Sequence, residues 1–140
     1  MRTIWRTLGC LMTLAPLPAL AAPPAPPAPA GDAARGRALL LQRQDSGCIL
    51  CHVLPGLPQG GDLGPPLSGL KQRYNRDALR ARIADARLGN PDTLMPPYFS
   101  TEGLHNVARA QQGRTVLGEQ ALADIVAYLL AEPADNDGRR

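Results

Sequence analysis

The clearest hydrophobic pattern in the chain lies near its C-terminal end, between Gly118 and Ala131. Glu119 stands in the first turn of this segment, where a negative charge is favourable beside the helix dipole. Apolar residues recur at the i, i+3, i+4, i+7 spacing of one helical face, at Leu122, Ile125, Val126 and Leu129. The spacing predicts an amphipathic helix over this segment.

A second amphipathic pattern runs from Arg76 to Leu88. Leu79 and Ile83 are expected to point inward, together with Ala86 or Leu88. The sequence Gly89-Asn90-Pro91 is a strong stop signal, so the predicted helix ends there.

A third helix is predicted to begin near Asp32, where Gly31 or Asp32 can act as the N-cap. Gly36 lies inside this helix, at a cost of about 1 kcal/mol relative to alanine. A second backbone crossing close to Gly36 would explain that cost; otherwise the glycine only weakens the helix. No strand–helix–strand alternation is present, so the sequence predicts an all-α fold.

The segments between the helices are predicted to be irregular. Val53–Leu70 is rich in glycine and proline, and Asn90–Phe99 is punctuated by proline. Thr101–Val116 is polar and without a helical period. Long loops in compact domains are usually functional, so Val53–Leu70 is a candidate for one side of a binding site.

Residues 1–21 have the features of a secretory signal peptide. Arg2 and Arg6 precede the apolar run Leu8–Leu20, and an A-x-A cleavage site ends at Ala21. The run is short and interrupted by proline, so it is a poor membrane span. We predict cleavage near Ala21 and a periplasmic location, with an uncleaved anchor as the alternative.

The rest of the chain divides into a proline–alanine linker at 22–30, one domain at 31–132 and a polar tail at 133–140. Loss of the signal peptide removes two arginines and lowers the formal net charge from +3 to +1. This balance gives no case for binding nucleic acid or an anionic membrane, and no membrane insertion is expected.

The strongest chemical motif is Cys48-Ile49-Leu50-Cys51-His52, which reads C-x-x-C-H. This is the attachment signature of a c-type haem. Two cysteines one helical turn apart can each add to a vinyl group along one haem edge. The histidine that follows is a good iron ligand through its neutral imidazole. The motif therefore predicts one covalently bound haem c, which the loop Val53–Leu70 would border on one side.

Two other uses of this motif fit less well. A thioredoxin-like redox pair should lie near a βαβ pattern, which is absent from the sequence. A structural zinc site needs four ligands, and outside the motif only Cys10 and His105 remain, with Cys10 in the signal peptide. Haem attachment is the preferred interpretation.

A six-coordinate haem needs a ligand opposite His52, and Met95 and His105 are the candidates. Met95 is the only methionine outside the signal peptide, and Pro96 and Pro97 stiffen its loop. A stiff loop can hold a thioether against iron, as in the His/Met pattern of cytochromes c. Met95 is therefore preferred over His105, although a lone methionine is more often core filler.

Four arginines fall near one side of the second predicted helix, and we call them the arginine face: Arg73, Arg76, Arg80 and Arg87. A solvated surface is the preferred interpretation. A docking patch, or partners for the haem propionates, is the alternative.

From Gly31 to Glu132 the chain resembles the class I cytochromes c. Gly36 and Tyr128 resemble the places where the N- and C-terminal helices cross around the haem in that family. Gly64-Pro65-Pro66-Leu67-Ser68-Gly69 resembles its G-P-x-L-x-G loop. The resemblance implies that the Pro65 carbonyl accepts a hydrogen bond from the His52 ring, which orients the ring, and that Leu67 packs on the haem.

A narrower resemblance is to the SoxX family, the monohaem cytochrome subunits of the sulfur-oxidising system. It is carried by 82–98, which contains N-P-D-T-L-M-P-P-Y, and by shorter matches at 106–108 and 121–129. It implies pairing with a SoxA subunit in a complex that joins thiosulfate to a cysteine of the carrier SoxYZ, an L-cysteine S-thiosulfotransferase.

In that complex this chain would be the electron-accepting subunit, without a catalytic residue of its own, and would pass electrons to an acceptor cytochrome. The residues expected to bind the cofactor are Cys48, Cys51, His52, Pro65, Leu67 and Met95, with His52 and Met95 on the iron. A free soluble electron carrier is the alternative function. A haem-based sensor is disfavoured because Met95 would close the sixth iron position.

Overall fold

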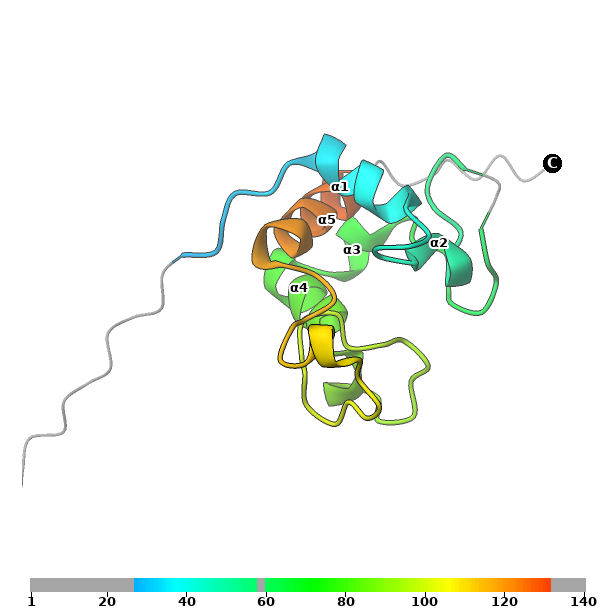
Figure 1. The fold of residues 1–140 in the computed structure, drawn as a ribbon. Coiled ribbons are helices and arrows are strands. Elements are labelled where there is room, and N and C mark those ends of the chain that lie inside the picture. The colour runs from blue at the N-terminus through cyan, green and yellow to red at the C-terminus, as the bar shows by residue number, and fades with distance from the viewer. Residues whose placement is uncertain (1–26, 58–59, 132–140) are drawn as a thin grey trace, which may run out of the picture.

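The computed structural model describes residues 27–57 and 60–131, and within these ranges all regular elements are helical (Figure 1). Their order is α1 (Ala33–Leu41), α2 (Cys48–Cys51), α3 (Leu70–Arg73), α4 (Arg76–Ala84), the 3-10 helices η1 (Ala86–Leu88) and η2 (Arg109–Gln111), and α5 (Glu119–Ala131). An isolated bridge joins Val53 to Gly60.

The predicted signal peptide at 1–21, part of the linker and the polar tail lie outside the described residues. Among the helices that are described, none is long and apolar enough to cross a membrane.

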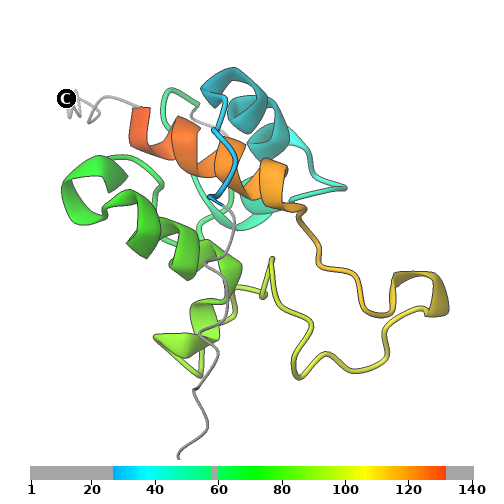
Figure 2. The ribbon, with the colours of Figure 1, turned by 90° about the vertical axis from the view of Figure 1, so that its left-hand side faces the viewer.

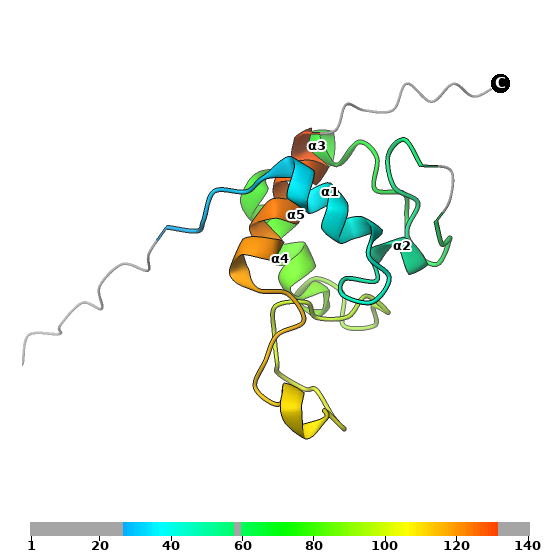
Figure 3. The same cartoon turned by 45° about the horizontal axis from the view of Figure 1, so that its top comes forward.

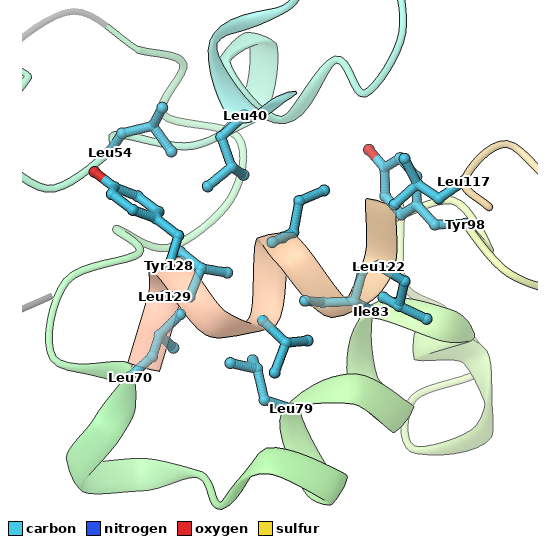
Figure 4. Packing of buried hydrophobic residues seen from close by; sticks show 12 residues of the cluster. Leu40, Leu54, Leu70, Leu79, Ile83, Tyr98, Leu117, Leu122, Tyr128 and Leu129 are labelled. Atoms are coloured by element: carbon cyan, nitrogen blue, oxygen red, sulfur yellow. The ribbon is translucent and has the colours of Figure 1, made fainter. Parts of the chain in front are cut away.

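The hydrophobic core is built around α5, whose apolar face is the one that the 3.6-residue period predicted. Leu122, Ile125 and Val126 are almost completely buried. Leu40 of α1 packs on one side of α5, while Leu79 and Ile83 of α4 pack on the other (Figure 4). Helix α5 is therefore the central element, and its neighbours cover it because each has one apolar stripe of its own.

Helices α1 and α5 cross in close contact at Gly36 (Figure 3). A Cβ atom added to Gly36 would collide with the backbone carbonyl group of Asp124. Glycine is therefore required here because it lets two helix backbones approach directly. The expected backbone crossing at Gly36 is confirmed, and Tyr128 lies buried one turn further along α5.

A buried carboxylate fastens the same crossing. The side chain of Asp124 is only 3% exposed and accepts hydrogen bonds from the Asp32 backbone N–H (2.7 Å) and from the Arg35 guanidinium (2.8 and 2.9 Å). Gln120 donates a further bond of 2.9 Å. The hydrogen bonds from Arg35 hold the pKa of Asp124 at about 2, below its ordinary value.

The second predicted helix differs from the structure at its end. Helix α4 stops at Ala84 because Asp85 adopts an extended conformation, and the Asp85 carboxylate then caps η1 by accepting from the Arg87 N–H. The segment predicted as one helix is thus α4 followed by η1. The short helix α3, which the glycine and proline content of its surroundings concealed, was not predicted.

Replacing Asp124 with asparagine tests the polar contact between α1 and α5. Asp124→Asn should lower the free energy of unfolding at pH 7 by about 2 kcal/mol, since charge-assisted bonds are lost inside the protein. The pKa of Asp124 is lower in the folded state, so its stabilisation is complete above about pH 4 and is lost as the pH falls towards 2.

The measurement is urea unfolding of both proteins from pH 7 down to pH 2. The difference between them should shrink with acidity, while Asp45→Asn, at an exposed position, should match wild type throughout. A difference that stays constant over this range would contradict the assignment.

Candidate functional site

Helix α2 is a single turn that carries both cysteines of the C-x-x-C-H motif. Gly47 precedes it in the left-handed conformation (φ 64°), and the His52 N–H bonds to the Cys48 carbonyl oxygen at 2.9 Å. Cys48 and Cys51 are half-buried and do not form a disulfide with each other. The two thiols therefore stand one turn apart, as the motif predicted.

The described part of Val53–Leu70, which we call the glycine-rich loop, follows α2 and folds back against it. The Gly61 N–H donates to the Ile49 carbonyl oxygen (3.0 Å), and the Gly64 N–H donates to that of Cys51 (2.7 Å). A Cβ atom at Gly61 would strike the α2 backbone, and one at Gly64 would strike the His52 ring. These positions require glycine because the loop lies directly on the motif.

The same loop orients the His52 ring. Nδ1 of His52 lies 2.6 Å from the Pro65 carbonyl oxygen. A carbonyl can only accept, so Nδ1 carries the proton and Nε2 keeps its lone pair for a ligand. The hydrogen bond expected from the G-P-x-L-x-G resemblance is therefore present.

Met95 lies in the loop Asn90–Phe99, which we call the Met95 loop and in which backbone N–H groups form hydrogen bonds. Its N–H donates to the Thr93 hydroxyl (3.2 Å), and the Phe99 N–H donates to the Ala84 carbonyl oxygen at the end of α4 (2.9 Å). The Met95 side chain is half-buried and packs against the core. The loop thus holds Met95 on the body of the domain.

Tyr98 connects the Met95 loop to the cysteines. Its side chain is buried and shares the cavity wall with Cys48, and burial raises the pKa of the Tyr98 hydroxyl well above its ordinary value. Burial also raises the pKa of the Cys48 thiol. Both groups are therefore protonated at neutral pH, and neither brings a negative charge into the site.

A cavity of about 380 Å³ joins α2, the glycine-rich loop, α4 and the Met95 loop. Among the residues that line it are five of the six predicted to bind the cofactor: Cys48, Cys51, His52, Pro65 and Met95. Leu67 is half-buried against the core and is not a lining residue, so its predicted contact with the cofactor stays a prediction. His105 is exposed and lies at a separate hollow.

Two members of the arginine face have anionic partners on the protein itself. Arg80 contacts the Glu119 carboxylate at 2.7 Å and lies over the Phe99 ring, 5.3 Å from its centre. Arg87 contacts Asp85 at 2.6 Å. The preferred interpretation of a solvated face therefore does not describe Arg80 and Arg87, whose side chains are held by contacts within the protein.

Arg73 is different, because it lines the cavity. Its guanidinium donates to the Ser68 carbonyl oxygen (2.9 Å) and to that of Gly69 (3.4 Å). Arg82 lines the cavity as well and was not singled out from the sequence. Arg76 is exposed at the start of α4. The sequence alone does not distinguish the arginines that line the cavity from the exposed one, whereas the folded structure does.

Comparison with known proteins identifies the family. The sequence profile of the cytochrome c family matches residues 33–132. This chain belongs to the cytochrome c family. A cytochrome c domain carries covalently bound haem c and transfers electrons, so the prediction from C-x-x-C-H is confirmed at the level of the family.

The fold comparison agrees with this assignment. A chain of the SoxXA crystal structure from P. pantotrophus superimposes with a TM-score of 0.65 at 24% sequence identity, covering 74% of this chain and 82% of that one. The predicted all-α, class I cytochrome c-like fold is confirmed. No curated protein sequence matches the chain.

The residues around the cavity of this cytochrome c fit a haem c. Two free thiols, an imidazole with an available Nε2 and a thioether line one cavity, which is the donor set that covalent attachment and axial ligation require. The other lining residues include Leu70, Leu79 and Tyr98, which supply apolar surface for a macrocycle.

Gly64→Ala tests the contact between the glycine-rich loop and the His52 ring. The new methyl group should push the ring away from Pro65 and lower the free energy of unfolding by about 1–3 kcal/mol. The His52 Nδ1–H should also exchange with solvent faster, as followed by NMR. Gly118→Ala is the control, since nothing lies within 4 Å of the added atom. Equal behaviour of the two variants would show that Gly64 does not confine the ring.

Proposed function

We propose that this chain is the electron-transfer haem c subunit of a SoxAX-type complex, an L-cysteine S-thiosulfotransferase of periplasmic thiosulfate oxidation. The observation that carries the proposal is the segment Asn90–Tyr98. It is the part of the sequence most similar to SoxX, and its residues Met95 and Tyr98 line the cavity beside the C-x-x-C-H motif. The fold similarity to SoxXA supports the same choice.

Cys48 and Cys51 hold one haem through thioether bonds in this proposal. Both thiols are unpaired and border the cavity from one helical turn. When bound, haem c supplies a one-electron redox couple. The protein's part is to fix this group, surround it with apolar side chains and orient its ligands.

His52 binds the iron through Nε2. The bond from Nδ1–H to the Pro65 carbonyl oxygen fixes the tautomer and raises the basicity of the ring. Gly64 leaves no space for the ring to tilt. The orientation of this ligand is thus set before any cofactor enters.

Met95 supplies the sixth ligand. It lines the same cavity as His52, whereas His105 lies at a separate hollow. The hydrogen bonds of the Met95 and Phe99 N–H groups order the backbone of the loop, which would help it to hold a weakly binding thioether against iron. Leu67 would complete the proposed contacts with the haem, and the cavity-lining Arg73 would be a candidate partner for its propionates.

The partner surface surrounds the cavity mouth. Leu63 and Leu94 border the cavity and are 65% and 78% exposed. Apolar side chains exposed together beside a redox site are suited to contact with another protein. A SoxA-like subunit covers them in this proposal, holds the reactive site and acts on a SoxYZ carrier, while this chain passes electrons to an acceptor cytochrome.

Met95→Ala tests the sixth ligand. A thioether favours ferrous iron, so its loss should lower the midpoint potential of the haem-loaded protein and let cyanide or carbon monoxide bind. Spectroelectrochemistry and ligand titration measure both effects. His105→Ala is the matched control and should behave like wild type; the opposite pattern would transfer the ligand role to His105.

Reduction by thiosulfate tests the function itself. The haem of this chain should be reduced when thiosulfate, a SoxA subunit and a SoxYZ carrier are all present, and absorbance spectroscopy follows the reaction. Omission of either protein should abolish it, because the proposed reactive site and the acceptor cysteine lie on those proteins. Equally fast reduction by thiosulfate alone would favour the free periplasmic electron carrier instead.

A further inference from the structure

Residues 101–116 form an arm that leaves the helical body after the Met95 loop (Figure 2). Its base is closed where the Leu117 N–H donates to the Tyr98 carbonyl oxygen at 2.9 Å, between two buried residues. None of the side chains at 101–116 is buried. The arm therefore adds nothing to the core, although ordering it costs conformational entropy.

The arm nevertheless has a defined shape. Gly103, Asn106 and Gly113 take left-handed conformations, with φ of 68°, 57° and 72°, and the short helix η2 lies between the last two. Arg87 fixes its first turn by donating to the Glu102 carbonyl oxygen at 2.9 Å. Compact surface loops of this size are frequently functional.

The arm folds around a hollow of about 450 Å³ that is rich in hydrogen-bond donors. His105, Gln111, Gln112 and Arg114 are among its lining residues, and no carboxylate lines it. Arg109 is not a lining residue, but it begins η2, the short helix that ends at the lining residue Gln111. The carboxylate of Glu102, the acidic residue of the arm, lies in the field of Arg87. The hollow is thus complementary to a negatively charged group.

The surroundings of the hollow favour a protein over a small anion. Leu104 and Val116 are exposed by 37% and 54%, and Leu104 lines the hollow. A free anion would gain nothing from these side chains, whereas an acidic protein segment would cover them. Mixed apolar and cationic surface of this kind is typical of protein interfaces.

We infer that the arm is a second docking element, which receives an acidic segment of the partner subunit in its hollow. This inference rests on the proposed function, because the partner is the SoxA-like subunit of the complex. The base of the arm follows the Met95 loop in the chain, since the arm begins three positions after Tyr98.

The test measures the affinity of haem-loaded protein for the SoxA-like subunit by titration calorimetry. Arg109→Glu/Arg114→Glu should weaken binding at least about tenfold at low salt, since like charges then face each other. Arg37→Glu, on the exposed side of α1, makes one charge reversal outside the arm, and Arg37→Glu/Arg43→Glu matches the double change. Both controls should stay within about twofold of wild type.

A second variant tests whether weaker binding could result from misfolding of the charge-reversal variant. Replacement of residues 102–115 by a short glycine–serine linker should leave the haem spectrum unchanged and weaken binding to a similar degree. Wild-type affinity in both arm variants, or equal losses in the Arg37/Arg43 control, would overturn the inference while leaving the proposed function intact. Failure of wild-type protein to bind the subunit at all would overturn both.

Discussion

The direct contact between the backbones of α1 and α5 is the constraint on which the rest of the structure depends. Gly36 permits it, and Asp124 fastens it by binding the start of α1. With these two helices fixed, α5 presents one face to α1 and another to α4. The loops between the helices can then be long and irregular, because the elements that anchor them do not move apart.

The same steric principle acts a second time at the site. Gly61 and Gly64 let a loop lie directly on the C-x-x-C-H segment, where any side chain would collide. This contact carries the Pro65 carbonyl to within 2.6 Å of His52 Nδ1. Glycine thus has two separate roles in this chain: it brings helices together in the core, and it brings a hydrogen-bond acceptor to the ring of a proposed metal ligand.

The sequence predicted those features that depend on local spacing. The helical period identified α5, and the C-x-x-C-H motif identified the two thiols. Met95 lies in the wall of the same cavity, and its role as the sixth iron ligand stays a prediction. The burial of Asp124 could not be predicted, because its partners Asp32 and Arg35 lie about 90 residues earlier in the chain. The different contacts of Arg73, Arg80 and Arg87 could not be predicted for the same reason, because they depend on how the chain folds.

Tyr98 links the parts of the molecule that the proposed function uses. It lines the cavity together with Cys48, and its carbonyl oxygen accepts the hydrogen bond that closes the base of the arm. Only two residues, Pro96 and Pro97, separate it from Met95. Tyr98 therefore belongs both to the wall of the cavity and, through its backbone, to the base of the arm.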